Sequence, residues 1–369
     1  MHLNLLKKFI YCIFAFAGFP FVIISFIYGF IDIKNQSQIE WLSSLIPISY
    51  AFFTVLILLS VITWQVIDVK KRKSALPIDN KRIASYCIIS CRYLLAAIII
   101  SYGFQKLLLD QFHTGYYWYG EELGKLSAMR LAWAFFDYSK LYSSVIGFSE
   151  IIGGSLLLFR RTTLLGALFL LPVLVNIALI DYNYDISAKD IITVLLLMDV
   201  FLISISLKPL LSFFLFQKTV EGKQIADGYS TATAHHTGFK VLAVACVLIL
   251  SILPNYLQMK PAMPTYFEGA WDATSAQDFT DTIPEKNKKL ILRLFVDGTI
   301  ATVKKTYQYE DFTLKYDSAK SFITLTSTSD TLHPDIITGN YKLIHKDSLI
   351  FTGRDGQDSV HWVFKRASK

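Results

Sequence analysis

Charged residues and cysteines are both scarce in this sequence of 369 residues. Only 18% of the residues are charged, against about 25% in ordinary soluble domains, which argues against a cytosolic enzyme. The four cysteines lie within apolar stretches, so the sequence shows neither a disulfide framework nor a CxxC redox pair. We interpret Cys87 and Cys91, one helical turn apart, as small buried side chains.

Histidine is absent from the long apolar stretches, because all seven histidines lie outside them. A protein-held haem within a membrane is therefore not expected. The sequence also lacks HExxH, P-loop and Rossmann motifs, and it predicts no metal site. A quinone stays compatible with the sequence, since an aromatic cleft and a few polar groups suffice to hold one.

Apolar residues are abundant: they make up 53% of the chain and include 28 Phe and 20 Tyr, with a mean hydropathy of +0.43. Up to position 257 they form blocks of about 18–25 residues, and a helix needs about 20 apolar residues to cross a bilayer. The sequence therefore predicts an α-helical polytopic membrane protein with seven spans. The predicted spans are 9–33, 44–68, 84–109, 140–160, 163–181, 188–207 and 239–257.

Positive charge along the chain predicts the orientation of these spans. Lys7 and Lys8 precede the first span, six Lys and Arg residues lie in the 69–83 loop, and four lysines lie in the 208–240 loop. By the positive-inside rule, these segments and the N-terminus are cytoplasmic. We therefore expect a multi-pass protein of the bacterial inner membrane with its C-terminal domain in the periplasm.

The net charge of +7 is explained by the same loops. The segment from Lys260 onward holds 15 Lys and Arg against 14 Asp and Glu, so +6 of the net charge belongs to the residues before it. Since cytoplasmic loops collect Lys and Arg, this excess does not indicate a nucleic-acid partner.

The C-terminal segment changes from long apolar blocks to short alternating ones, which predicts an all-β domain. Asp297-Gly298 between two apolar runs is typical of a hairpin turn, and about eight short strands favour a small barrel or sandwich. The sequence thus divides into two N-terminal spans with a basic loop (1–83), a four-helix core (84–210), a cytoplasmic loop with the last span (211–260) and a periplasmic β-domain (261–369).

Three ionisable residues lie deep within the predicted spans, where charge is costly. Arg92, Glu150 and Asp199 are each about 12–15 Å from the cytoplasmic end of their span, at a rise of 1.5 Å per residue. We predict that these three, with Asn176 nearby, form a buried polar cluster that acts as a proton relay or anchors a ligand. The alternative is a buried ion pair that only fixes helix packing.

A second polar layer is expected near the outer face, where long side chains can reach the headgroups. The aromatic segment 110–139 is predicted to lie at the same interface and to form a lid over the core. The residues of this outer layer are Lys106, Asp181, Tyr182, Tyr184 and Asp185.

Four motifs within residues 84–210 resemble those of DoxX-like membrane proteins. They are an arginine with Gly-x-x-Lys, a Gly-to-Trp stretch, a glutamate before a glycine pair and a basic-Thr turn, and an Asn-to-Asp stretch. In this sequence they are Arg92 with Gly103 and Lys106, Gly124 to Trp133, Glu150 with Gly153-Gly154 and Arg160-Arg161-Thr162-Thr163, and Asn176 to Asp185. Asp199 belongs to none of them.

The DoxX resemblance implies a four-helix membrane core with two helices before it and one after it. Family members include a small subunit of a thiosulfate–quinone oxidoreductase and a methylamine-utilisation membrane protein, so a redox association is implied. The C-terminal segment begins Gly269-Ala270-Trp271 and ends near Arg366, and this opening with a late basic residue resembles lipocalin-like barrels.

The sequence therefore predicts a redox-associated membrane subunit that binds a quinone-like or other lipophilic ligand through its buried polar cluster. The alternative is a non-enzymatic anchor or assembly factor whose periplasmic β-domain binds a protein or lipid. A transporter is disfavoured, because the spans show no paired Gly- or Pro-broken helices in repeated halves. The expected partners are the lipid bilayer and a membrane or periplasmic protein, with no nucleic acid.

Overall fold

The computed structural model consists of two compact units. One contains Met1–Phe112 and Phe135–Met259, and the other contains His113–Ala134 and Lys260–Lys369. The structure describes residues 3–30, 36–73, 79–109, 111–112, 123–219, 237–258, 269–278, 292–297, 300–305, 308–317, 319–327, 335–344, 347–356 and 358–366. Of the aromatic segment 110–139, residues 110 and 113–122 lie outside the described residues.

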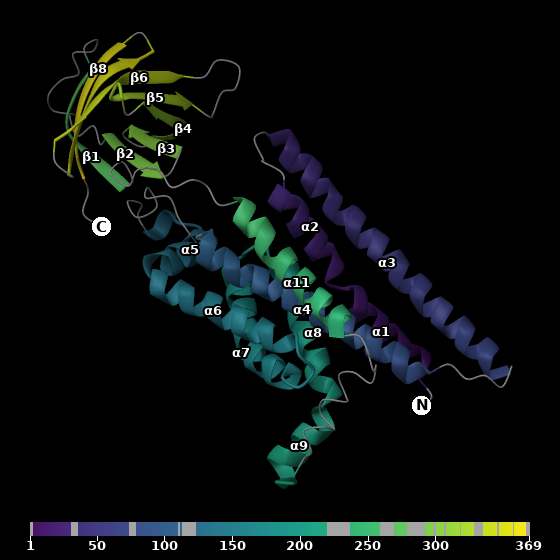
Figure 1. The fold of residues 1–369 in the computed structure, drawn as a ribbon. Coiled ribbons are helices and arrows are strands. Elements are labelled where there is room, and N and C mark those ends of the chain that lie inside the picture. The colour runs from purple at the N-terminus through teal and green to yellow at the C-terminus, as the bar shows by residue number, and fades with distance from the viewer. Residues whose placement is uncertain are drawn as a thin grey trace. The chain divides into compact units, whose positions relative to one another are not determined.

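The described chain up to residue 258 is helical (Figure 1). Polar caps mark several helix starts: Asn4 accepts a hydrogen bond from the Lys7 N–H, and Asp79 accepts from the N–H groups of Lys81 and Arg82. The helices are α1 (Leu5–Phe16), α2 (Phe19–Phe30), α3 (Gln36–Lys73), α4 (Asn80–Leu108), η2 (Leu123–Lys125), α5 (Ala128–Tyr138), α6 (Lys140–Leu157), α7 (Thr163–Asn183), α8 (Lys189–Ile205), α9 (Leu207–Phe216) and α11 (Thr237–Gln258).

Four described segments are long and apolar enough to cross a membrane, which is fewer than the seven predicted. They are Leu5–Ile24, Ser44–Lys71, Asn80–Leu108 and Thr163–Asn183, and α8 with α9 makes a fifth if the pair, bent by 69°, is one span. The prediction of seven spans is not supported by length and composition. Two predicted spans are not among these segments: α6 carries Lys140 and Glu150 within its 18 residues, and the described side chains of α11 cover the shorter apolar segment Val241–Leu257.

Helix α4 is the central helix of the helical unit and packs against α1, α6, α8 and α11. Its stretch from Leu94 to Ile100 is buried throughout, as expected for a helix that is apolar all round and surrounded by neighbours. Helix α3 instead exposes large apolar side chains such as Phe52, Leu58 and Ile62. An exposed apolar surface of this kind is typical of a face that contacts lipid or another protein.

Glycines bring α4, α6 and α7 close together. Gly103 of α4 lies against Gly147 of α6, and a Cβ at either position would stand 2.7–2.9 Å from the carbonyl oxygen of the other. Of the adjacent pair in α6, Gly154 faces α4, whereas Gly153 faces α7, where Gly166 approaches its carbonyl oxygen. The adjacent glycines therefore allow close packing at two interfaces, α6 with α4 and α6 with α7.

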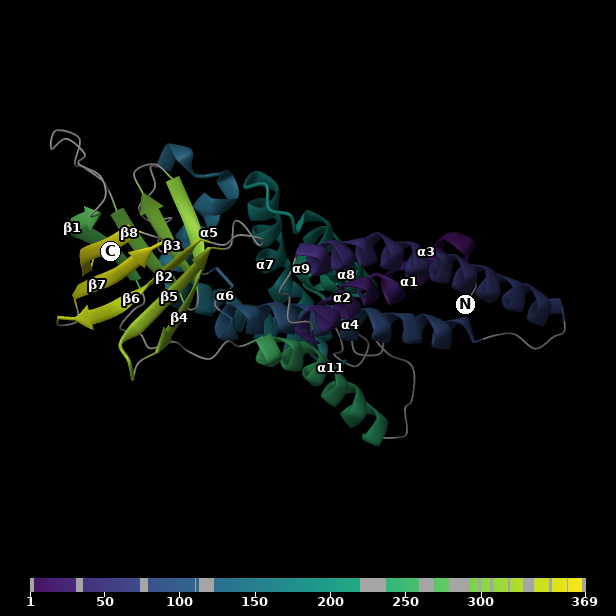
Figure 2. The ribbon, with the colours of Figure 1, turned by 90° about the horizontal axis from the view of Figure 1, so that it is seen from above.

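The C-terminal strands form a closed antiparallel barrel in which each strand pairs with the next and β8 returns to β1. Figure 2 shows the strands following one another around this barrel. The sequence prediction of short antiparallel strands is confirmed, and the barrel form is found in place of a sandwich. The strands are β1 (Gly269–Asp278), β2 (Leu292–Asp297), β3 (Ile300–Lys305), β4 (Gln308–Asp317), β5 (Phe322–Ser327), β6 (Ile336–Leu343), β7 (Ser348–Asp355) and β8 (Asp358–Arg366).

Side chains fill the interior of the barrel. Every second residue of β5 is buried, as the two-residue period of a strand requires. Trp271, Phe312 and Phe364 are among the largest fully buried side chains. Trp271 stands opposite Arg366 in the pairing of β1 with β8, and the guanidinium carbon of Arg366 lies 4.7 Å from its ring centre. A cation–π contact therefore joins the first and last strands where the barrel closes.

Replacing Arg366 by Met is expected to weaken this closure, because the ring of Trp271 loses its cation but keeps an apolar neighbour. The expected loss is about 1 kcal/mol of unfolding free energy, seen as faster hydrogen exchange in β1 and β8 by mass spectrometry. Lys365→Met is the matched control, since Lys365 is exposed on the neighbouring position of β8. Equal exchange in both variants would contradict a role for the contact in closure.

Candidate functional site

A buried ion pair joins α4 and α6. The Lys106 ammonium lies 3.0 Å from Oε1 and 2.9 Å from Oε2 of Glu150. The two side chains are only 5% and 1% exposed. Since isolated charges are strongly disfavoured in an apolar interior, each of these two charges is stabilised by the other. The sequence predicts Glu150 in the buried polar cluster and Lys106 in the outer layer, and the structure brings the two side chains into contact.

The antiparallel packing of α4 and α6 explains why Glu150 pairs with Lys106 and not with Arg92. Side chains lean toward the N-terminus of their own helix. Lys106, near the end of α4, therefore leans back along the bundle, and Glu150 leans in the opposite direction toward it. Arg92 leans away from Glu150, toward the start of α4. The close approach at Gly103 and Gly147 leaves room for the pair to meet.

Two aromatic rings lie close to the Lys106 ammonium. Its nitrogen lies 5.6 Å from the ring centre of Tyr102 and 5.7 Å from that of Phe112. The ring of Phe112 stacks on Phe136 with 4.6 Å between centres, and Phe136 in turn stacks on Tyr142. Phe112 and Phe136 come from the segment expected to form a lid, and the stack places aromatic surface beside the ion pair.

A second carboxylate belongs to the same region. Asp181 of α7 is buried and lies within electrostatic range of Lys106. The carboxylates of Asp181 and Glu150 also lie within electrostatic range of the Tyr102 hydroxyl. The centre therefore combines one ammonium, two carboxylates and a phenol from three helices. A lysine ammonium has three donors, so Lys106 can hold Glu150 and still donate a hydrogen bond to a ligand.

The other residues of the predicted outer layer lie apart from this centre. Tyr182 is exposed, and its hydroxyl lies 2.8 Å from the Thr193 hydroxyl of α8. Asp185 and Lys189 form an exposed ion pair, and the hydrogen bond from Lys189 holds the pKa of the Asp185 carboxyl below its usual range. Tyr184 is half-buried. The predicted contact of Tyr182, Tyr184 and Asp185 with lipid headgroups stays a prediction.

The predicted cluster of Arg92, Glu150, Asp199 and Asn176 does not assemble as one group. Arg92 is buried and donates to Thr163 Oγ1 and to the carbonyl oxygen of Leu158, both at 3.4 Å. Arg92 and Lys106 are 14 residues apart on α4, about 21 Å along the axis. Asn176 is exposed on α7. Counting residues from the span ends was a poor guide, because the contacts of Gly103 with Gly147 and of Gly154 with Ile100 place Glu150 about two turns from Arg92 along α4.

Asp199 is a separate buried carboxyl. It is 0% exposed on α8, lies within electrostatic range of Cys91, and neither of its oxygens bonds to any residue that the structure describes. Burying a polar group without a partner costs about 1–3 kcal/mol. A group kept at this cost is a candidate for a proton-binding position.

Replacing Asp199 by Val is expected to raise the unfolding free energy by about 1–3 kcal/mol, because the unmet polar group is removed at similar volume. Thermal denaturation in detergent would show the gain as a higher Tm. Asp199→Asn is the control, since it keeps an unmet polar group and should gain less. A lower Tm for the Val variant would show that Asp199 has a stabilising partner.

A further buried network links α1, α3 and α4, and no sequence pattern predicts it. Lys8, which is 0% exposed, donates to Asp68 at 2.5 Å and to Gln65 Oε1 at 2.8 Å. Asn80 donates to the same aspartate and accepts a hydrogen bond from the Trp64 indole. Lys8 is predicted from the sequence to be a cytoplasmic charge before the first span, and the structure adds that its ammonium pairs within the protein.

Comparison with known proteins finds a likeness to a bacterial protein. The chain is 34% identical over 139 residues to the uncharacterized protein YwoB of Bacillus subtilis (strain 168), and the match covers 85% of YwoB and 36% of this chain. The chain belongs to the YwoB family. YwoB is described only as uncharacterized, so this membership carries no activity. No family model and no solved structure matches the chain.

Proposed function

We propose that the chain is an integral protein of the bacterial inner membrane and that its helical unit binds the polar head of a quinone-like lipophilic ligand at Lys106 and Glu150. In this proposal it serves as a redox-associated membrane subunit. The single observation that carries the proposal is the buried Lys106–Glu150 ion pair beneath the rings of Phe112 and Phe136.

The donor set fits a planar head group with carbonyl oxygens. Lys106 supplies a hydrogen-bond donor, Glu150 and Asp181 supply carboxylates that can hold a proton, and Tyr102 and Phe112 supply flat apolar surface. A quinone, when bound, supplies two-electron carrier chemistry. The residues themselves bind and orient the head group, exclude water and hold a proton at the Glu150 carboxylate. The resemblance to DoxX-like proteins supports the same assignment.

The membrane placement extends to all seven predicted spans in this proposal. Helices α6 and α11 have 18 and 22 residues, about 27 and 33 Å at 1.5 Å per residue, which approaches or equals the thickness of a hydrocarbon core. With both counted, the basic loops lie in the cytoplasm and the β-barrel lies in the periplasm. The likeness of the barrel to lipocalin-like proteins is part of this proposal, supported by the Trp271–Arg366 contact.

The test is a titration of the purified full chain in detergent with a short-tailed benzoquinone, in which binding is measured by the rise in Tm. We expect the wild type to be stabilised and the double variant Lys106→Met/Glu150→Leu to show at least about tenfold weaker binding, since a charge-assisted hydrogen bond is lost. Lys189→Met is the control, because it alters an exposed ion pair elsewhere. Equal binding by all three proteins would overturn the assignment of the site.

The second candidate is a non-enzymatic anchor or assembly factor that works through its barrel. It is favoured by the filled barrel interior, which leaves the outer surface and rims of that unit to contact a protein or lipid. The same titration separates the two candidates, because this one predicts no quinone binding by any variant.

A further inference from the structure

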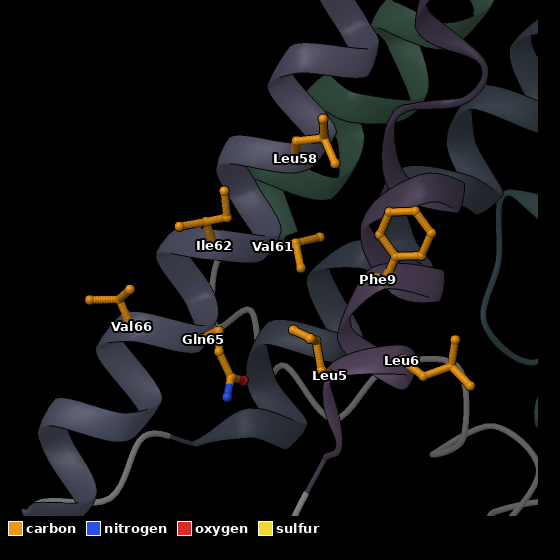
Figure 3. Close-up of a pocket in the computed structure, with 8 residues that line it drawn as sticks. All are labelled: Leu5, Leu6, Phe9, Leu58, Val61, Ile62, Gln65 and Val66. Atoms are coloured by element: carbon orange, nitrogen blue, oxygen red, sulfur yellow. The ribbon is translucent and has the colours of Figure 1, made fainter.

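A groove of about 560 Å³ runs between α1 and α3. Figure 3 shows Val61 of α3 on the side of Phe9 of α1, with Gln65 and Leu5 at the opposite end of the groove from Leu58. Its volume lies in the range of small-molecule sites, about 300–1,000 Å³. The groove is therefore an apolar channel on an exposed part of the helical unit, with one polar side chain near its end.

The orientation of the Gln65 amide is determined by Lys8. A lysine ammonium only donates hydrogen bonds, so the atom that faces it at 2.8 Å is the Gln65 oxygen. The ammonium is itself fixed by Asp68. The Gln65 NH₂ group consequently points away from this network, and it donates to no residue within the described parts of the chain. A buried ion pair thus holds an unused donor at the wall of an apolar groove.

Basic charge lies beyond the polar end of the groove. Ile62, Val66 and Lys70 are spaced four residues apart, so they follow one face of α3. Lys70 is five residues from Gln65, about 7–8 Å along the helix. A phospholipid has the same order of groups, with acyl chain, ester carbonyl and phosphate in succession from the membrane interior to its surface.

We propose that the α1–α3 groove binds one acyl chain of an anionic phospholipid, whose ester carbonyl accepts a hydrogen bond from Gln65 and whose phosphate lies at Lys70. This inference rests on the membrane placement proposed above, but not on the quinone site. It makes the Lys8–Asp68 pair a positioning device, because that pair sets the direction of the Gln65 amide.

The test is native mass spectrometry of the delipidated full chain titrated with phosphatidylglycerol, with phosphatidylcholine of the same chains, and with the diether analogue of the phosphatidylglycerol. Ile62→Trp fills the groove and is expected to weaken phosphatidylglycerol binding about tenfold or more. Lys70→Gln should reduce the preference for phosphatidylglycerol over phosphatidylcholine about fivefold. The diether lipid should bind the wild type no better than the ester lipid binds Gln65→Leu.

Leu59→Trp is the matched control, because Leu59 is 55% exposed and Ile62 57% exposed on the same helix, and Leu59 does not line the groove. Equal lipid binding by the two Trp variants, or equal binding of both headgroups by the wild type, would overturn the proposal. A change from dimer to monomer in Ile62→Trp with unchanged lipid binding would assign the groove to a second copy instead. Release of the wild type from membranes by alkaline carbonate would show that the membrane placement itself has failed.

Discussion

Replacing Lys106 by Met is expected to lower the unfolding free energy by about 3–5 kcal/mol, because it leaves the Glu150 carboxylate buried without its cation. Glu150 is 1% exposed and cannot reach water without opening the α4–α6 interface. The change should appear as a large fall in Tm and in the yield of folded protein extracted from membranes.

The double variant Lys106→Met/Glu150→Leu is expected to recover most of this loss. Replacing both members of a buried pair by apolar groups of similar size is often neutral or stabilising. Lys189→Met is the control, since its ion pair with Asp185 is exposed and should leave the Tm unchanged. A Lys106→Met variant as stable as Lys189→Met would contradict the burial of the pair.

Replacing Gly103 by Leu is expected to cost about 3 kcal/mol or more, at the upper end of overpacking effects. A Cβ at this position would stand 2.7 Å from the Gly147 carbonyl oxygen and 2.6 Å from Ile151 Cγ1. The backbone oxygen cannot move aside as a flexible side chain can, so α4 and α6 must separate. Because Lys106 and Glu150 bridge the same two helices, the variant should also lose the ion pair.

The matched control for the glycine prediction is Gly124→Leu. A Cβ at Gly124 meets nothing within 4 Å, so this variant should unfold like the wild type. Differential scanning fluorimetry of both variants in the same detergent gives the comparison. Similar Tm values for the two would show that α4 and α6 do not need the close approach at Gly103.

Much of the secondary structure follows from sequence patterns that have a single physical cause. The two-residue alternation in the C-terminal segment appears in β5 as Ile323 and Leu325 buried between less buried neighbours. Length and apolar composition predict the segments within α3, α4 and α7. Helices with polar residues or sharp bends, such as α6 and the α8–α9 pair, are harder to predict as spans, because their position in the bundle depends on contacts with neighbouring helices and not on hydropathy.

The polar contacts were harder to predict than the elements that carry them. Counting along the sequence puts Arg92, Glu150 and Asp199 at one depth, but the contact of Gly103 with Gly147 places Glu150 beside the half of α4 that carries Lys106. Lys8 and Asp68 are separated by 60 residues, so only the packing of α1 on α3 reveals their pairing. Hydropathy gives depth along a span, whereas partner choice depends on helix faces and crossing points.

In the proposed function, the Lys106–Glu150 centre holds a quinone-like ligand in the membrane. The most direct measurement is organic extraction and mass spectrometry of protein purified gently from its membranes, comparing the wild type with Lys106→Met/Glu150→Leu. We expect near-stoichiometric quinone in the wild type and little in the double variant at equal folded yield. Equal amounts of quinone in both, or none in the wild type, would contradict the claim.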